Sequence, residues 1–191
     1  SYFCWGLFRM LGDRKYGSPQ NALTVWKDHM VSQGFGYRLD VDLPGEGRGF
    51  IPNAGVYDKA YRGRWNGLTI ISISIGQGEI LATPLQIANL GATIANRGHF
   101  TPPHIVKEIQ DGELDSIYRT PRGPTIERQY YEEIVKGMRA AVTGGTCRIA
   151  GSILPGVEVC GKTGTAQNRG KDHSAFMGFA PMNNPKIAIA V

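Results

Sequence analysis

The residues best suited to chemistry lie in one short stretch near the C-terminal end of the chain. A lysine and two threonines stand within four residues there, from Lys162 to Thr165. An ammonium group with hydroxyls and backbone N–H groups beside it suits a substrate that carries a carboxylate and a carbonyl whose oxygen becomes negatively charged. Gly164 separates the two threonines and would let another backbone approach without a side chain in the way. The residue types therefore predict a binding site for an anionic acyl substrate.

The local pattern predicts that this stretch is a β-strand. A Pro-Gly turn at 155–156 precedes it, and valines alternate with a more polar residue over 157–159. The two-residue period of a strand would direct Lys162 and Gly164 to one face and the two threonines to the other. An alternative is an edge strand whose lysine only points into water and opposes aggregation. The tripeptide Lys-Thr-Gly does not decide between them, because at average residue usage it occurs in about one chain in twenty-five of this length.

Composition limits the class of protein. The chain has 191 residues, 41% of them hydrophobic, which fits one domain with a core of its own. The formal net charge is +5, but the basic residues are scattered among acidic ones and form no stripe. A nucleic-acid-binding protein would show such a stripe or a recognisable motif, so nucleic acid is not expected as a partner. No stretch approaches the ~20 apolar residues of a transmembrane helix.

Cysteine and histidine usage predicts neither a metal nor a cofactor. Cys4, Cys147 and Cys160 make an odd number without the spacing of metal ligands, so we expect buried free thiols rather than a disulfide. The four histidines are dispersed. Asp172 and His173 are adjacent, and for this pair we favour a structural hydrogen bond over metal binding.

Four helices are predicted from apolar periodicity and from start and stop signals. The first lies within 1–11, and the second begins at an N-cap serine followed by proline and ends before the glycines at 34 and 36. The third begins at the capping box Thr83-Pro84-Leu85-Gln86 and ends before Gly98. The fourth runs from Arg128 to a Gly-Gly stop at 144–145. The apolar faces comprise Phe3, Leu7, Met10 and Leu11; Val25, Trp26 and Met30; Ile87, Leu90, Ile94 and Ala95; and Tyr131, Ile134, Val135, Met138 and Val142.

The remaining segments are predicted as strands and loops. The region 37–67 is rich in turn residues, and its Arg62, Arg64 and Trp65 either line a cleft or form a solvated loop with one packed tryptophan, which is the interpretation we favour. An apolar alternation over 70–75 leads into Gly76-Gln77-Gly78, a tight turn with an architectural role. A hairpin is expected from strands at 104–109 and 114–118 around an Asp-Gly turn. Further strands are expected at 174–180, antiparallel to the lysine strand, and at 186–191.

Several motifs together resemble one enzyme family. The segment Gly161-Lys162-Thr163-Gly164-Thr165-Ala166-Gln167 resembles the third signature motif of the penicillin-binding serine transpeptidases. Ser74-Ile75-Gly76-Gln77-Gly78 and Thr83-Pro84-Leu85-Gln86 are similar to elements of class B penicillin-binding proteins. Arg62-Gly63-Arg64-Trp65-Asn66 and Asp172-His173-Ser174 resemble the cell-elongation type, penicillin-binding protein 2. The resemblance extends over nearly the whole chain.

This resemblance implies a fold and a cellular role. The expected fold is a layered α/β (α+β) arrangement, with a mostly antiparallel sheet flanked by helices, as in serine transpeptidases and β-lactamases. Residues 1–191 would be the C-terminal portion of one transpeptidase domain, truncated at both ends. The parent enzyme would be a peptidoglycan D,D-transpeptidase in the periplasm, anchored in the inner membrane. Its implied partners are D-alanyl-D-alanine stem peptides, β-lactams, the missing N-terminal part of the same protein and membrane proteins of the elongation complex.

The resemblance also implies a role for each site residue. Lys162 would organise the proton network and the electric field around the catalytic serine. The hydroxyls of Thr163 and Thr165 would bind the terminal carboxylate, and the backbone N–H of Thr165 would be one oxyanion donor. Gly164 and Gln167 would also contact the substrate, with Asn168 at the rim. No cofactor and no metal are implied.

Two other family motifs are absent from the chain. Neither Ser-x-x-Lys, which supplies the nucleophile and its base, nor Ser-x-Asn occurs. Thr24-Val25-Trp26-Lys27 has the first spacing with threonine, but it lies inside a predicted helix. We therefore expect the 191-residue chain to be inactive. The alternatives are a β-lactamase or a non-catalytic β-lactam-binding or protein-interaction domain, and an upstream Ser-x-x-Lys would favour the enzyme.

Overall fold

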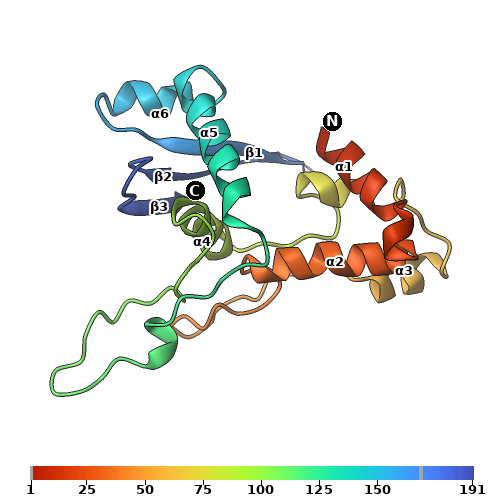
Figure 1. Cartoon of the computed structure of the whole chain (residues 1–191), viewed down its shortest axis with the longest axis horizontal. Helices are drawn as coiled ribbons and strands as arrows, with labels where there is room; N and C mark the ends of the chain where they lie inside the picture. The colour runs from red at the N-terminus through yellow and green to blue at the C-terminus, as the bar shows by residue number, and fades with distance from the viewer. Residues whose placement is uncertain (1, 168–169) are drawn as a thin grey trace. The chain divides into compact units, whose positions relative to one another are not determined.

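The computed structural model describes residues 2–167 and 170–191 and divides into two compact units (Figure 1). The first unit comprises residues 1–37 and 49–82, and the second comprises residues 38–48 and 83–191. The first contains α1 (Tyr2–Leu11), η1 (Arg14–Tyr16), α2 (Pro19–Ser32), α3 (Ala54–Tyr61) and η2 (Ile71–Ile75). The second contains α4 (Pro84–Ala95), η3 (Ser116–Tyr118), α5 (Arg128–Thr143), α6 (Arg148–Ile153), β1 (Cys160–Ala166), β2 (His173–Ala180) and β3 (Ile187–Ala190). Among the helices that the structure describes, none combines the length and the apolar character needed to cross a bilayer.

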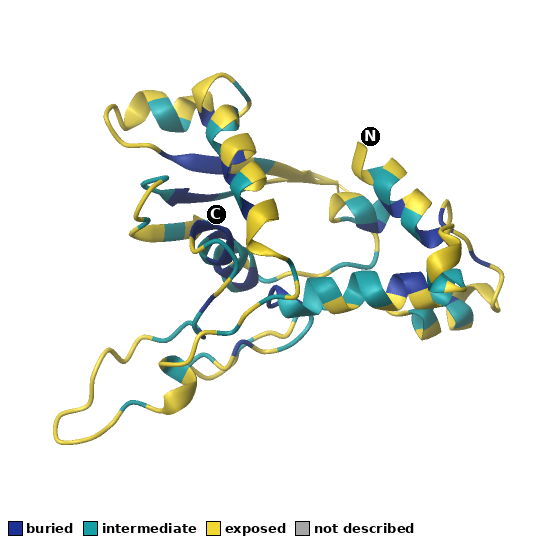
Figure 2. Cartoon of the chain, in the orientation of Figure 1, coloured by how far each residue is buried: buried dark blue, intermediate teal, exposed yellow. Residues whose placement is uncertain are grey.

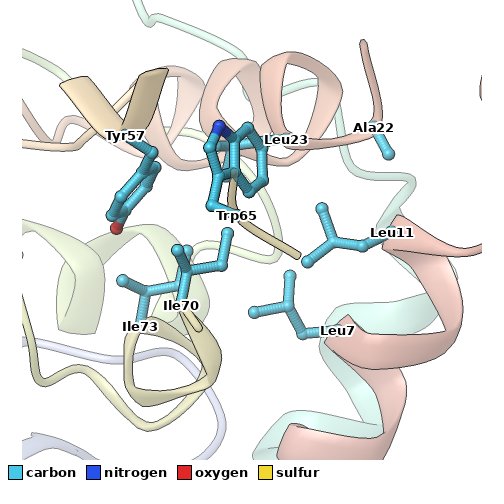
Figure 3. Packing of buried hydrophobic residues seen from close by; sticks show 8 residues of the cluster. All are labelled: Leu7, Leu11, Ala22, Leu23, Tyr57, Trp65, Ile70 and Ile73. Carbon is cyan, nitrogen blue, oxygen red and sulfur yellow. The ribbon is translucent and has the colours of Figure 1, made fainter. Parts of the chain in front are cut away.

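The first unit is built around an apolar cluster supplied by helices distant in sequence. Side chains from α1, α2, α3, the η2 turn and the segment between α3 and η2 point toward one another, as Figure 3 shows. The buried members are Leu7, Leu11, Ala22, Leu23, Tyr57, Trp65, Ile70 and Ile73. The N-terminus of α2 is fixed as expected, because the Ser18 hydroxyl accepts a hydrogen bond from the Asn21 N–H and Pro19 occupies the first helical position.

Trp65 belongs to this core. Its side chain is only 7% exposed, and its indole Nε1 donates to Asp58 Oδ1 at 2.7 Å, which satisfies the polar atom of a buried ring. Arg62 and Arg64 are exposed, and Arg62 has the left-handed conformation that ends α3. Trp65 is therefore a packed core residue and the two arginines are solvated, as in the interpretation favoured from the sequence.

Two expectations for the first unit need correction. The region predicted as loop contains α3, which begins because the Asn53 side chain accepts from the Val56 N–H at 3.1 Å. The alternating segment 70–75, for which no element was predicted, forms the 3-10 turn η2 with Ile73 buried. Phe3 is 67% exposed, so the buried face of α1 consists of Leu7 and Leu11.

The second unit has a three-stranded antiparallel sheet in the order β1-β2-β3. Helices α4 and α5 pack on one face of this sheet, and their buried side chains meet those of the strands in a second apolar cluster. That cluster comprises Ile94, Ala95, Tyr131, Val135, Met138, Cys160 and Phe179. Gly91 allows α4 to lie close to the sheet, because a Cβ there would be 3.3 Å from Met177 Cγ. The prediction of a mostly antiparallel sheet flanked by helices is confirmed.

The predicted start of α4 is confirmed in detail. The Thr83 hydroxyl accepts from the Gln86 N–H at 3.2 Å, and Gln86 Oε1 accepts from the Thr83 N–H at 3.1 Å, which completes a capping box. The fully buried Gln86 amide also donates to the Arg48 carbonyl at 3.0 Å. Both polar atoms of the Gln86 side chain, Oε1 and Nε2, therefore stabilise the start of α4.

We expect Thr83→Ala to lower the free energy of unfolding of the chain by about 1 kcal/mol, because it removes the N-cap acceptor. Urea denaturation followed by circular dichroism measures the change. Thr143→Ala is a matched control, since the hydroxyl of this exposed threonine in the last turn of α5 donates to the Ala140 carbonyl of its own helix and caps no helix start. Equal stability of the two variants would contradict a stabilising role for the cap.

The predicted hairpin over 104–118 is wrong, since no strand occurs there. The backbone N–H groups of Ile105 and Val106 donate instead to the carboxylate of Asp42, at 2.9–3.0 Å. These hydrogen bonds lower the pKa of Asp42. The Tyr118 hydroxyl donates to the Asp40 carbonyl at 3.0 Å. A side chain distant in sequence thus takes the donors that a partner strand would have used.

The C-terminal half of the second unit follows the sequence prediction with one correction and one additional helix. Helix α5 buries Tyr131, Val135, Met138 and Val142 as expected, whereas Ile134 is exposed. A short helix, α6, follows it and was not predicted. All three cysteines are free thiols, and Cys147 and Cys160 are buried while Cys4 is half-buried.

Candidate active site

The predicted site residues lie on β1, at the edge of the sheet. Among residues 2–167 and 170–191, β1 pairs only with β2, so its other side meets no strand. Figure 2 shows that β1 is buried where it begins and exposed toward its end. Cys160 and Gly161 are buried, whereas Lys162, Gly164 and Thr165 are exposed. The strand therefore combines an anchored start with an accessible second half.

The strand register separates the site side chains between two faces. Lys162 lies opposite Met177, on the face that packs against α4 and α5, and Thr163 lies opposite Phe176 on the other face. Thr165, opposite Ser174, shares the face of Thr163. The predicted division of lysine and threonines between the faces is confirmed.

Backbone directions follow from the hydrogen bonds between β2 and the end of the chain. The N–H and C=O groups of Phe176 bond to Val191, at 2.8 and 2.9 Å, and therefore point away from β1. Because these groups alternate along an antiparallel strand, those of Met177 point toward Lys162. The backbone groups of Thr163 and Thr165 consequently lie along the outer edge of β1.

The start of the outer edge is covered by a side chain of α5. Arg139 donates from Nη1 to the carbonyl of Val159 at 3.0 Å. This charge-assisted hydrogen bond ties α5 to the residue that precedes β1. The exposed part of the edge thus begins after the buried Gly161.

Lys162 and Thr163 each make one further hydrogen bond within the site. The Lys162 ammonium donates to the carbonyl of Thr163, so the lysine side chain bends toward the outer edge. The Thr163 hydroxyl donates to the hydroxyl of Thr146 at 3.0 Å. Thr146 lies in the loop between α5 and α6, and this loop therefore contacts the site.

The strand is held at its start by close packing around Phe176. A Cβ at Gly161 would lie 2.6 Å from the ring of Phe176, and one at Gly178 would lie 2.7 Å from it and 2.9 Å from the Cys160 carbonyl oxygen. A Cβ at Gly161 would displace the Phe176 ring, and one at Gly178 would displace both the ring and the backbone of β1. The aromatic ring thus occupies the space of two missing side chains and helps to set the position of the lysine that follows.

Cys160 is the thiol nearest in sequence to the site lysine. Burial raises the pKa of this thiol above its usual value, so it stays protonated at neutral pH. Its side chain belongs to the cluster between the sheet and the helices. Cys160 is therefore a packing residue and not a nucleophile.

The other residues that were considered from the sequence lie outside β1. Gln167 follows β1 directly and is exposed, whereas Asn168 lies outside the described residues. Thr24 is in the interior of α2 and bonds to the Gln20 carbonyl at 2.9 Å. Gly76 and Gly78 both have positive φ, +74° and +71°, which supports an architectural role for that turn.

Asp172 and His173 lie at the start of β2, where His173 pairs with Ala166 of β1. Both are exposed. No group of three or more His, Cys, Asp or Glu side chains that could hold a metal ion occurs in residues 2–167 or 170–191.

Sequence analysis did not identify Thr146. The Gly144-Gly145 pair beside it indicated only where the preceding helix ends, although a hydroxyl residue after two glycines also suits a tight loop that approaches a strand. Its contact with Thr163 spans 17 residues and depends on the fold.

A protein-family model matches most of the chain. Residues 19–191 match the model of the penicillin binding protein transpeptidase domain. Among curated proteins, the chain is 36% identical over 192 residues to the peptidoglycan D,D-transpeptidase MrdA of Acinetobacter baumannii, with 90% of this chain and 28% of that protein covered.

Solved structures of penicillin-binding proteins share the fold. Pseudomonas aeruginosa PBP2 in complex with WCK 5153 matches with a TM-score of 0.79 and 31% identity, covering 99% of this chain and 40% of that one. Helicobacter pylori PBP2, solved in complex with MreC, matches with a TM-score of 0.75 and 24% identity over 99% of this chain and 33% of that one. The chain thus spans less than half of each of these three proteins.

Proposed function

The chain belongs to the penicillin-binding protein transpeptidase domain family, and from this premise we propose that it forms the substrate-binding wall of a peptidoglycan D,D-transpeptidase. The observation that carries the proposal is the exposed edge of β1, which presents an ammonium group, two hydroxyls and outward-directed backbone groups within four residues.

An extended peptide is the ligand that this edge suits best. A peptide laid along the outer side of β1 would meet the backbone groups of Thr163 and Thr165, as in recognition by strand addition. A C-terminal carboxylate on that peptide would lie near the threonine hydroxyls and the Lys162 ammonium, which are all donors of charge-assisted hydrogen bonds. The edge would thereby select an extended chain that ends in a carboxylate, which describes a D-alanyl-D-alanine stem peptide. β-Lactams present a carboxylate beside a reactive carbonyl and suit the same donors.

The proposed roles follow from this pose. Thr163 and Thr165 bind the carboxylate through their hydroxyls, and the backbone N–H of Thr165 donates to the oxygen that becomes negative when a nucleophile attacks the carbonyl. Lys162 supplies the positive field that favours this charge. Gly164 leaves room for the ligand backbone, and Gln167 contacts the ligand beyond the end of the strand.

The reaction itself needs groups that this chain does not contain. In the family a serine attacks the carbonyl to form an acyl-enzyme, which then passes the acyl group to an amine, and the serine comes from a Ser-x-x-Lys motif. No Ser-x-x-Lys and no Ser-x-Asn occur among the 191 residues. We infer that the chain alone is inactive and that the full-length protein supplies the nucleophile and its base.

Location and partners are further parts of the proposal. The resemblance to the cell-elongation type implies a periplasmic domain with an inner-membrane anchor elsewhere in the full-length protein. It also implies membrane-associated partners of cell-wall elongation, and Helicobacter pylori PBP2 has been solved in complex with a protein, MreC. A role in cell shape follows from the same proposal.

Intact-mass measurement after incubation with excess benzylpenicillin tests the function. We expect no adduct on the 191-residue chain and one stoichiometric acyl adduct on the full-length protein. An adduct on the chain alone would mean that one of its own hydroxyls is the nucleophile. No adduct on the full-length protein would contradict the enzyme and favour a non-catalytic interaction domain.

A further inference from the structure

Two threonine hydroxyls from different parts of the second unit form one hydrogen-bonded pair. Thr163, on β1, donates from Oγ1 to Oγ1 of Thr146 at 3.0 Å. The other contact of the Thr146 hydroxyl is weak, because the Cys147 sulfur lies 4.0 Å away. The proton of Thr146 can therefore be redirected at little cost.

The backbone that carries Thr146 is fixed by close packing. A Cβ at Gly145 would lie 2.8 Å from the Cα of Ala141 and 3.0 Å from its carbonyl oxygen, so the loop passes directly over the last turns of α5. The Cys147 N–H donates to that same carbonyl at 2.9 Å. Cys147 is buried in a third apolar cluster with Val142 and Val159. The residues on both sides of Thr146 are thus held, and its hydroxyl has a defined position beside β1.

A hydroxyl group has one proton to donate. In the observed arrangement Thr163 directs that proton to Thr146, and it cannot at the same time donate it to a ligand carboxylate. If Thr163 turns its proton to the carboxylate, its oxygen remains an acceptor, and Thr146 can donate to it by rotation of its own hydroxyl. Each hydrogen bond in such a chain polarises and strengthens the next.

We propose that Thr146 is a positioning residue of the carboxylate-binding site, and that the Thr146–Thr163 hydroxyl pair reverses its direction of donation when an anionic ligand binds. This inference rests on the proposed function and adds to it a residue that acts through Thr163. Before the ligand binds, Thr146 fixes the position of the Thr163 hydroxyl oxygen. After the ligand binds, Thr146 donates to that oxygen while the Thr163 hydroxyl donates to the carboxylate.

The inference predicts a different effect on β-lactam binding for each of three substitutions. Thr146→Val keeps the shape of the side chain but removes both the donor and the acceptor, and we expect about tenfold weaker binding of a carboxylate-bearing β-lactam before acylation. Thr146→Ser retains the hydroxyl and should restore most of the affinity. Thr143→Val, at an exposed site in the last turn of α5, is the control and should change neither affinity nor rate.

The test uses the full-length protein with benzylpenicillin and with its methyl ester, which has no carboxylate charge. Stopped-flow acylation over a range of concentrations separates the dissociation constant of the first complex from the rate constant of acylation. We expect the loss in Thr146→Val to appear in the dissociation constant, with benzylpenicillin and not with the ester. In a Thr163→Val background, Thr146→Val should have no further effect, because the relay is already broken.

Several results of these measurements would overturn the inference. An equal loss with both ligands would assign Thr146 a purely structural role and overturn the inference, as would an unchanged dissociation constant. A loss that persists in the Thr163→Val background would also overturn it. Absence of any adduct on the unsubstituted full-length protein would instead overturn the proposed function, and this inference with it. Thermal unfolding of each variant confirms that the compared proteins are folded.

Discussion

Replacement of Lys162 by alanine is expected to lower the rate of acylation of the full-length protein by β-lactams by about 10²–10³-fold, the usual effect of removing one preorganised electrostatic donor. Lys162 is exposed, and its ammonium lies at the outer edge of β1, where it donates to the Thr163 carbonyl. A fixed positive charge there would stabilise both the carboxylate of the ligand and the negative oxygen that develops during attack. Intact-mass time courses with benzylpenicillin measure the effect.

Lys136 provides the matched control for this substitution. It is an exposed lysine on α5 whose ammonium is 2.6 Å from the Glu133 carboxylate. Lys136→Ala removes the same charge from the protein, so a general loss of positive field would slow acylation equally in both variants. An effect confined to Lys162 is expected. Acylation of Lys162→Ala at the unsubstituted rate would remove this lysine from the site.

The largest effect on stability is expected from Gly178→Ala, which should lower the free energy of unfolding by about 2–3 kcal/mol. A Cβ at this position would lie 2.7 Å from the ring of Phe176 and 2.9 Å from the Cys160 carbonyl oxygen. The oxygen belongs to the backbone of β1 and cannot move without displacing the strand that carries the site. Urea denaturation of the 191-residue chain, monitored by tryptophan fluorescence and circular dichroism, gives the value.

Gly164→Ala is the control for stability, because it adds the same methyl group to the same sheet. A Cβ there would lie 3.9 Å from that of Ala175, an ordinary contact. We expect this variant to unfold within about 0.5 kcal/mol of the unsubstituted chain, as exposed substitutions usually do. If Gly178→Ala were equally harmless, the close approach of β1 and β2 around Phe176 would not limit the packing of the sheet.

Local chemistry explains where prediction from the sequence succeeded. The start of α4 is set by Thr83 and Gln86, which bond to each other's backbone within one turn, so the signal is complete in the sequence. The lysine strand and its antiparallel neighbour were predicted because alternation and turn residues are also local properties. The same locality allowed the division of Lys162 and the threonines between two faces to be foreseen.

Nonlocal bonds explain the failures. The hairpin over 104–118 was inferred from an apolar run and an Asp-Gly turn, but the carboxylate of Asp42, more than sixty residues away in sequence, takes its backbone donors. Phe3 follows the helical period of α1 and yet lies outside the apolar cluster, since periodicity gives the direction of a side chain and not what covers it.

The sequence by itself determined the family motif, the residue types of the site and the strand that carries them, because each depends on spacing within a few residues. Only the tertiary structure decided that β1 is an edge strand, that Arg139 covers its start, and that the Thr146 hydroxyl meets Thr163. These features depend on how α5 and the loop after it pack against the sheet. Contacts of that kind join residues separated by 17 and 20 positions, and no local pattern encodes the distance between them.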